Sequence, residues 1–98
     1  MYMRQIDLNS ILRAACHVAG CSVAKAKGRC RRMPCMTARY LYFALAVEKG
    51  ERRFKAAWHI NRTSATAIYY SKVTKRRMAH DDFTELLNKT RIYYEKSI

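Results

Sequence analysis

The sequence predicts an all-α protein, a single small bundle of about five helices that contains a helix-turn-helix. Its 98 residues suffice for one domain and not for two, and half of them are hydrophobic, so a core is possible. Glycine and proline number three and one, too few for a β protein rich in turns. Apolar residues instead recur at helical spacing along most of the chain. We therefore expect residues 1–98 to form one helical domain.

Two apolar stripes that end at glycines predict the first two helices. Residues 7–18 are followed by Gly20, which stands where a C-cap would, and one face carries Ile11, Leu12, Ala15 and Val18. Residues 36–49 end at Gly50, and their buried stripe is Ala38, Leu41, Tyr42, Leu45 and Ala46.

The segment between these two helices is strongly basic. Residues 22–35 contain Gly28 and Pro34, both of which interrupt regular structure, so we expect an extended or irregular basic loop. The loop carries Lys25, Lys27, Arg29, Arg31 and Arg32.

Residues 52–78 have the pattern of a helix-turn-helix. A short helix over residues 52–59 is expected to face inward through Phe54, Ala57 and Trp58. Asn61 then marks a tight turn, because asparagine accepts the left-handed conformation. The helix over residues 63–78 starts with hydroxyl side chains, and its helically spaced apolar residues are Ala65, Ile68 and Tyr69.

The last predicted helix covers residues 82–95. Asp82 is expected to be its N-cap, and Glu85 occupies the capping-box position. Its apolar side should close over the core through Phe83, Leu86, Leu87 and Tyr94.

Positive charge is concentrated in the middle of the chain. Lysine and arginine number 20 against seven acidic residues, for a formal net charge of +13. Between Leu8 and His80 the only acids are Glu48 and Glu51, while that span carries 16 of the 20 basic residues. Such self-repulsion is typical of proteins whose partner is a polyanion. No apolar run approaches the roughly 18 residues of a membrane span, so we expect a cytoplasmic protein without a membrane partner.

The stretch "HINRTSATAIYY" raises a question about Arg62. The residues that lead the predicted recognition helix are Arg62, Thr63, Ser64 and Thr66. A cation is disfavoured at a helix start, where the helix dipole is positive. We therefore expect an anion in front of Arg62, and a DNA phosphate or a guanine edge would satisfy it.

Three pieces of the sequence resemble one known family in the same order. "VAGCSVAKAKGRCRR" resembles the end of a helix and a basic loop, "TARYLYFAL" resembles an Ala/Pro-Arg-x-x-x-x-x-Leu helix, and "NRTSATAIYYSKV" resembles the signature Gly-Arg-Asp-His-(Ser/Thr)-Thr-Val. The family is the C-terminal DNA-binding domain of the bacterial chromosomal replication initiator, DnaA. The resemblance implies a helical domain that places the signature helix in the major groove and a basic-loop Arg in the minor groove. The chain has no G-x-x-x-x-G-K-[ST] loop, so we expect a stand-alone domain without ATPase activity.

The resemblance also implies individual roles. Arg31 stands eight residues before Arg39, as the family's minor-groove Arg does, and Arg39 matches an Arg that contacts phosphates or bases. Arg62 and Thr66 match the first Arg and the second Thr of the signature. Thr63, Ser64 and Ala65 replace the family's Asp, His and Thr, so we expect the chain to read a target site of its own and not the initiator's.

The predicted function is therefore sequence-specific binding of double-stranded DNA, in replication initiation or its regulation. The predicted contacts are Arg29, Arg31, Arg32, Arg39, Arg62, Thr63, Ser64, Thr66 and Lys72. An RNA-binding module is an alternative, although Trp58, Tyr69 and Tyr70 are interpreted as packing residues rather than stacking platforms.

The cysteines leave a third interpretation open, a zinc-stabilised interaction protein without nucleic-acid specificity. Their spacing is C-x4-C-x8-C-x4-C, whereas structural zinc sites more often use C-x2-C pairs, so we expect thiols without a metal at Cys16, Cys21, Cys30 and Cys35. Three scattered histidines and few carboxylates offer no catalytic arrangement. We therefore expect neither an enzyme nor a cofactor.

Overall fold

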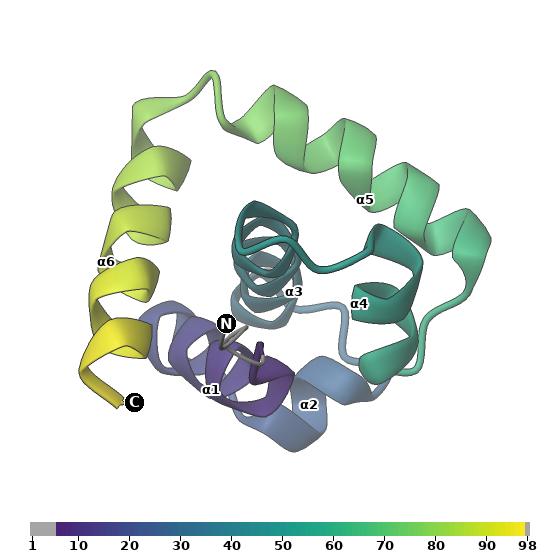
Figure 1. The fold of residues 1–98 in the computed structure, drawn as a ribbon, viewed down its shortest axis with the longest axis horizontal. Coiled ribbons are helices and arrows are strands. Elements are labelled where there is room, and N and C mark those ends of the chain that lie inside the picture. Colours follow the sequence, from purple (N-terminus) through teal and green to yellow (C-terminus); the bar gives the residue numbers. More distant parts are fainter. Residues whose placement is uncertain (1–5, 98) are drawn as a thin grey trace, which may run out of the picture.

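Six helices make up the part of the chain that the structure, a computed structural model, describes, residues 6–97 (Figure 1). No strand is present in that part, which confirms the all-α prediction. The helices are α1 (Leu8–Ala19), α2 (Val23–Lys27), α3 (Met33–Glu48), α4 (Arg53–His59), α5 (Ser64–Arg77) and α6 (Asp81–Ser97). None of them is both long and apolar enough to cross a membrane.

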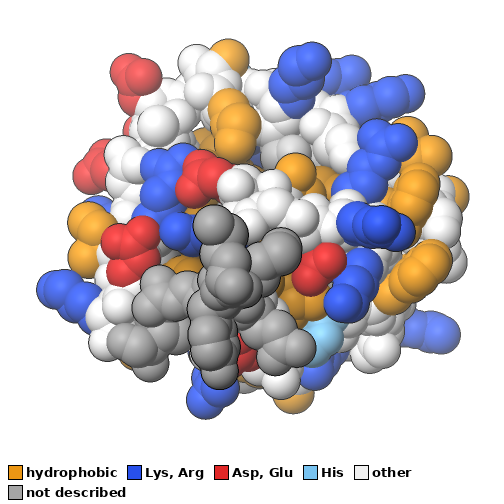
Figure 2. All heavy atoms as spheres, in the orientation of Figure 1, with side chains coloured by type: hydrophobic (Ala, Val, Ile, Leu, Met, Phe, Trp, Pro, Cys, Tyr) orange, Lys and Arg blue, Asp and Glu red, His pale blue; other side chains and the backbone are white. Residues whose placement is uncertain are grey.

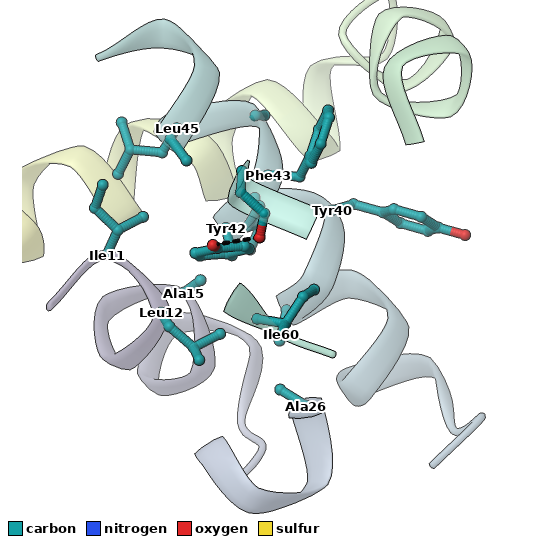
Figure 3. Packing of buried hydrophobic residues seen from close by; sticks show 14 of the residues in the cluster. Ile11, Leu12, Ala15, Ala26, Tyr40, Tyr42, Phe43, Leu45 and Ile60 are labelled. Atoms are coloured by element: carbon teal, nitrogen blue, oxygen red, sulfur yellow. Dashed lines mark hydrogen bonds between the residues drawn. The ribbon is translucent and has the colours of Figure 1, made fainter. Parts of the chain in front are cut away.

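Helix α3 occupies the centre of the molecule, and the other helices surround it (Figure 1). Residues 38–46 are buried on every side of the helix, which is typical of a core helix. The Tyr42 hydroxyl donates a 2.6 Å hydrogen bond to the Ala56 carbonyl, so the buried phenol is satisfied. Side chains from α1, α2 and the turn after α4 converge on α3 (Figure 3), among them Ile11, Leu12, Ala15, Ala26 and Ile60.

The predicted helix ends at Gly20 and Asn61 are confirmed. Gly20 caps α1 in the left-handed conformation, with φ of 82°. Asn61 has φ of 62°, and it follows α4 in a Schellman motif. In that motif the N–H of Arg62 bonds to the Ala57 carbonyl and the N–H of Asn61 bonds to the Trp58 carbonyl, both within 3.0 Å. A four-residue turn thus joins α4 to α5, and the two helices pack together.

The basic loop is shorter than the predicted residues 22–35, and this prediction was wrong at both ends. Ser22 caps α2 by accepting a 3.2 Å hydrogen bond from the Lys25 N–H, so residues 23–27 are helical. Pro34 lies in the first turn of α3, where a missing N–H breaks no helical hydrogen bond. Only residues 28–32 remain as the connection, and we call them the basic loop.

The position of Asp82 also differs from the prediction. Helix α6 begins at Asp81, so Asp82 lies within its first turn instead of capping it. The carboxylate there still faces the positive end of the helix dipole. The predicted apolar side of α6 is confirmed, because Phe83, Leu87 and Tyr94 are buried and Leu86 packs against the core.

The inward face of α4 is confirmed at Ala57, which is buried, and at Phe54, which packs against the core, but other expectations for α4 and α5 were wrong. Trp58, expected in the core, is 58% exposed. Ala65, Ile68 and Tyr69 are all exposed, and α5 is buried instead through Ala67, Tyr70 and Thr74. The Tyr70 ring decides this orientation, because it packs edge-on against Tyr40 and Phe43 of α3, with centroid distances of 5.4 and 5.7 Å.

Candidate nucleic-acid interface

Helix α5 presents one continuous exposed face to solvent. Positions three and four apart share a face of a helix, and the exposed residues at this spacing are Ser64, Ala65, Ile68, Tyr69, Lys72 and Arg76. Lysine and arginine side chains gather on the α5 side of the molecule, while most visible acidic side chains lie on the α6 side (Figure 2). The face therefore combines hydroxyl, apolar and basic groups in a positive environment.

The hydroxyl residues at the start of α5 have different roles. Thr63 is the N-cap, because its Oγ1 accepts a 3.3 Å hydrogen bond from the Thr66 N–H. The Thr63 and Thr66 hydroxyl oxygens also lie 3.2 Å apart. Ser64 is exposed, and its hydroxyl has no hydrogen-bond partner among residues 6–97. Ser64 and the outer side of Thr66 are thus the polar groups available to a ligand.

Neutral backbone carbonyls of the chain, and no anion, lie in front of the Arg62 guanidinium among the described residues. Its guanidinium donates to the carbonyl oxygens of Gly28, Ile60 and Lys27, at 2.6, 3.1 and 3.3 Å. Two of these carbonyls end α2, where the helix dipole is negative. Arg62 therefore joins the basic loop to the turn before α5, a role that the predicted base or phosphate contact did not include.

Arg39 supports the same loop from α3. It is only 5% exposed, and its Nε donates to the Ala26 carbonyl at 2.8 Å. Its Nη2 donates to the carbonyls of Lys25 and Gly28, both at 3.1 Å. Burial and these hydrogen bonds hold the Arg39 guanidinium inside the protein, which argues against the predicted direct DNA contact.

The remaining predicted cations are exposed. Arg29, Arg31 and Arg32 of the basic loop and Lys72 of α5 form no ion pair with any carboxylate in the described part of the chain. The ion pairs found there lie elsewhere, joining Arg91 to Glu48, Lys49 to Glu95, Lys55 to Glu51 and Lys89 to Glu85. No acidic side chain of the described residues therefore neutralises the exposed cations of the basic loop and Lys72 of α5.

A groove of ≈ 490 Å³ separates the basic loop from α5. Arg31 lines it from the loop and Thr66 and Tyr69 line it from α5, while its floor includes Arg39, Tyr40 and Arg62. Burial raises the pKa of Tyr40, so its phenol stays protonated. Four of the nine predicted DNA contacts line this groove, namely Arg31, Arg39, Arg62 and Thr66. The other five predicted contacts lie outside its lining, and they are Arg29, Arg32, Thr63, Ser64 and Lys72.

The prediction missed the exposed apolar residues of this surface. Ile68 is 44% exposed and Tyr69 is 56% exposed, beside Lys72 on the same helix. The spacing of Ala67, Tyr70 and Thr74 was the available signal, since these three also share a helix face.

No group of three or more histidine, cysteine or acidic side chains is arranged to hold a metal ion within residues 6–97. The four cysteines are free thiols. Comparisons of the chain with protein-family models, with curated proteins and with solved structures find no match.

Proposed function

We propose that the protein binds double-stranded DNA in a sequence-specific manner, with α5 as the recognition helix and the basic loop as a second contact. The observation that carries this proposal is the groove that Arg31 and Thr66 share, because loop and recognition helix then approach one duplex together. The exposed cations of the basic loop and α5 lack acidic partners among the described residues, and this supports a polyanionic ligand.

The exposed face of α5 suits the major groove. An α-helix fits the groove of about 12 Å in B-DNA, and residues of its first turns reach base edges. Ser64 offers a hydroxyl for a base or a phosphate, and Ile68 offers an apolar contact for a thymine methyl group. Lys72, one turn further, is placed to bind a phosphate or a guanine.

The basic loop supplies the second part of the proposed interface. We propose that Arg31 enters the adjacent minor groove, whose narrow form has an enhanced negative potential. Arg29 and Arg32, exposed on either side of it, would bind phosphates. Arg39 and Arg62 support the basic loop from inside the protein, because both donate hydrogen bonds to the Gly28 carbonyl.

The resemblance to the initiator domain points to replication initiation or its regulation as the process, and hence to a protein of the cytoplasmic nucleoid. The RNA-binding alternative keeps one supporting observation, because Trp58 and Tyr69 are exposed and not buried as expected. Competition between duplex DNA and structured RNA for the protein separates these two functions.

Fluorescence anisotropy with a labelled duplex over a range of salt concentrations tests the interface. The logarithm of the binding constant should fall linearly with the logarithm of the salt concentration. Arg31→Ala and Lys72→Ala should each weaken binding and reduce that slope by about one.

Lys89→Ala is the matched control for these two variants. Lys89 lies on α6, and its Nζ is 3.7 Å from the Glu85 Oε1. Removing this side chain should leave the salt dependence of the binding constant unchanged. The proposed surface would be contradicted if the salt dependence of the binding constant changed equally in all three variants. It would also be contradicted if binding by the wild-type protein did not depend on salt.

A further inference from the structure

The four cysteines gather where α1, α2 and the start of α3 meet. Cys30 and Cys35 lie closest, with their sulfur atoms 2.7 Å apart and the Cys35 thiol donating to Cys30. Cys21, Cys30 and Cys35 line one small cavity of ≈ 120 Å³ together with Lys25 and Arg32. The spacing in the sequence gave no sign that two of these thiols touch.

The cavity offers an approach to one sulfur of the pair. Cys30 is half-buried in the basic loop, whereas Cys35 is 2% exposed in the first turn of α3. The Cys35 thiol and the Arg32 N–H both donate hydrogen bonds to Cys30, and this lowers the pKa of the Cys30 thiol. The hydrogen bond to Cys30 and burial raise the pKa of Cys35, so Cys35 retains its proton.

We propose that Cys30 and Cys35 form a redox-active dithiol, a modification site at which a hydroperoxide such as hydrogen peroxide produces an intramolecular disulfide. The proposal rests on the contact between the two sulfurs and on the basic cavity beside them. It does not depend on the proposed DNA binding. The new bond would tie the middle of the basic loop, next to Arg31, to the start of α3.

The reaction balances in two steps. The Cys30 thiolate attacks one oxygen of the peroxide, the O–O bond breaks, and the departing hydroxide takes up a proton to become water. The Cys35 sulfur then attacks the Cys30 sulfenic acid, the S–O bond breaks, and the hydroxyl leaves as water with the Cys35 proton. Two thiols lose two electrons in total, and one peroxide is reduced to two waters.

The other two cysteines are less suited to this reaction. Cys16 is buried, and burial raises its pKa to about 12, so it offers no thiolate. The Cys21 thiol lines the same cavity and neighbours Cys35, but it donates its 3.1 Å hydrogen bond to the Ser22 carbonyl and makes no contact with Cys30 as short as that of Cys35. Cys21→Ser tests whether this third thiol takes part in the reaction and is the matched control variant.

The test treats the reduced full-length chain with hydrogen peroxide, blocks the remaining thiols with N-ethylmaleimide, and maps tryptic peptides by mass spectrometry. The expected product joins the peptide of residues 30–31 to that of residues 33–39 through a disulfide, while residues 14–25 carry two maleimide labels. Cys21→Ser should give the same cross-link. In Cys35→Ser, dimedone should label Cys30 as the trapped sulfenic acid.

Three results would overturn the proposal. The first is maleimide labelling of all four thiols after peroxide treatment. The second is a disulfide in the wild-type protein that includes Cys16 or Cys21. The third is stoichiometric zinc bound to the thiols of the untreated protein. The wild-type peptide map decides the matter even where a serine variant folds poorly.

Discussion

Arg62 and Arg39 come from different parts of the chain, and their guanidiniums meet at the Gly28 carbonyl oxygen. Each donates three hydrogen bonds to backbone carbonyls, five of the six at the end of α2 and one at Ile60 in the turn after α4. Both matched DNA-contacting residues by their place in the sequence, and both hold the basic loop in the structure. Sequence could identify these arginines as important, but not whether their partner is a phosphate or a backbone carbonyl.

Replacing these two arginines by methionine tests this role. Methionine keeps part of the aliphatic stem and removes the charged donors, so buried carbonyls lose their partners. Arg39→Met should lower the free energy of unfolding by about 2 kcal/mol, and Arg62→Met by about 1 kcal/mol because Arg62 is only half-buried. Urea denaturation followed by circular dichroism measures both changes.

Arg29→Met is the control, because Arg29 is an exposed cation of the same loop and should change stability by less than about 0.5 kcal/mol. If Arg39→Met and Arg62→Met were as stable as Arg29→Met, the two guanidiniums would not be holding the loop.

At the scale of elements, helix ends with a local signal were predictable. The C-cap at Gly20 and the turn at Asn61 depend on backbone conformations close in sequence, and they appear as expected. The ends of the basic loop were not predicted, because Pro34 breaks a helix interior but suits a first turn. The buried face of α5 depends on Tyr70 contacting Tyr40 and Phe43, which no local pattern contains.

The turn between α4 and α5 sets the orientation of α5, the proposed recognition helix. Asn61 is the only non-glycine residue with positive φ among residues 6–97. Asn61→Val should destabilise the protein by about 1–2 kcal/mol, because a β-branched residue is strained in the left-handed conformation. Thermal or urea unfolding measures this change.

Asn61→Gly provides the comparison, since glycine adopts positive φ without strain. This variant should keep the stability of the wild-type protein to within a few tenths of a kcal/mol. Equal destabilisation by valine and glycine would show that the Asn61 side chain, and not the turn conformation, matters.

At the scale of the whole molecule, the fold separates the two signs of charge. The ion pairs of the described residues lie on α3, α4, their connection and α6, while the exposed cations of the basic loop and α5 form no ion pair. Lysine and arginine side chains gather on the α5 side of the molecule (Figure 2). The excess of positive charge was evident from composition. The convergence of Arg31 and Thr66 on one groove was not, because it depends on how α5 packs across α3.

Selection from a random duplex DNA library tests the central claim most directly. The wild-type protein should enrich one motif, and structured RNA should not displace the enriched duplex. Ser64→Ala or Ile68→Ala should change the preferred bases, whereas Ile92→Ala, an exposed isoleucine on α6, should leave the motif unchanged. Recovery of no motif, or displacement of the duplex by RNA, would contradict sequence-specific DNA binding through α5.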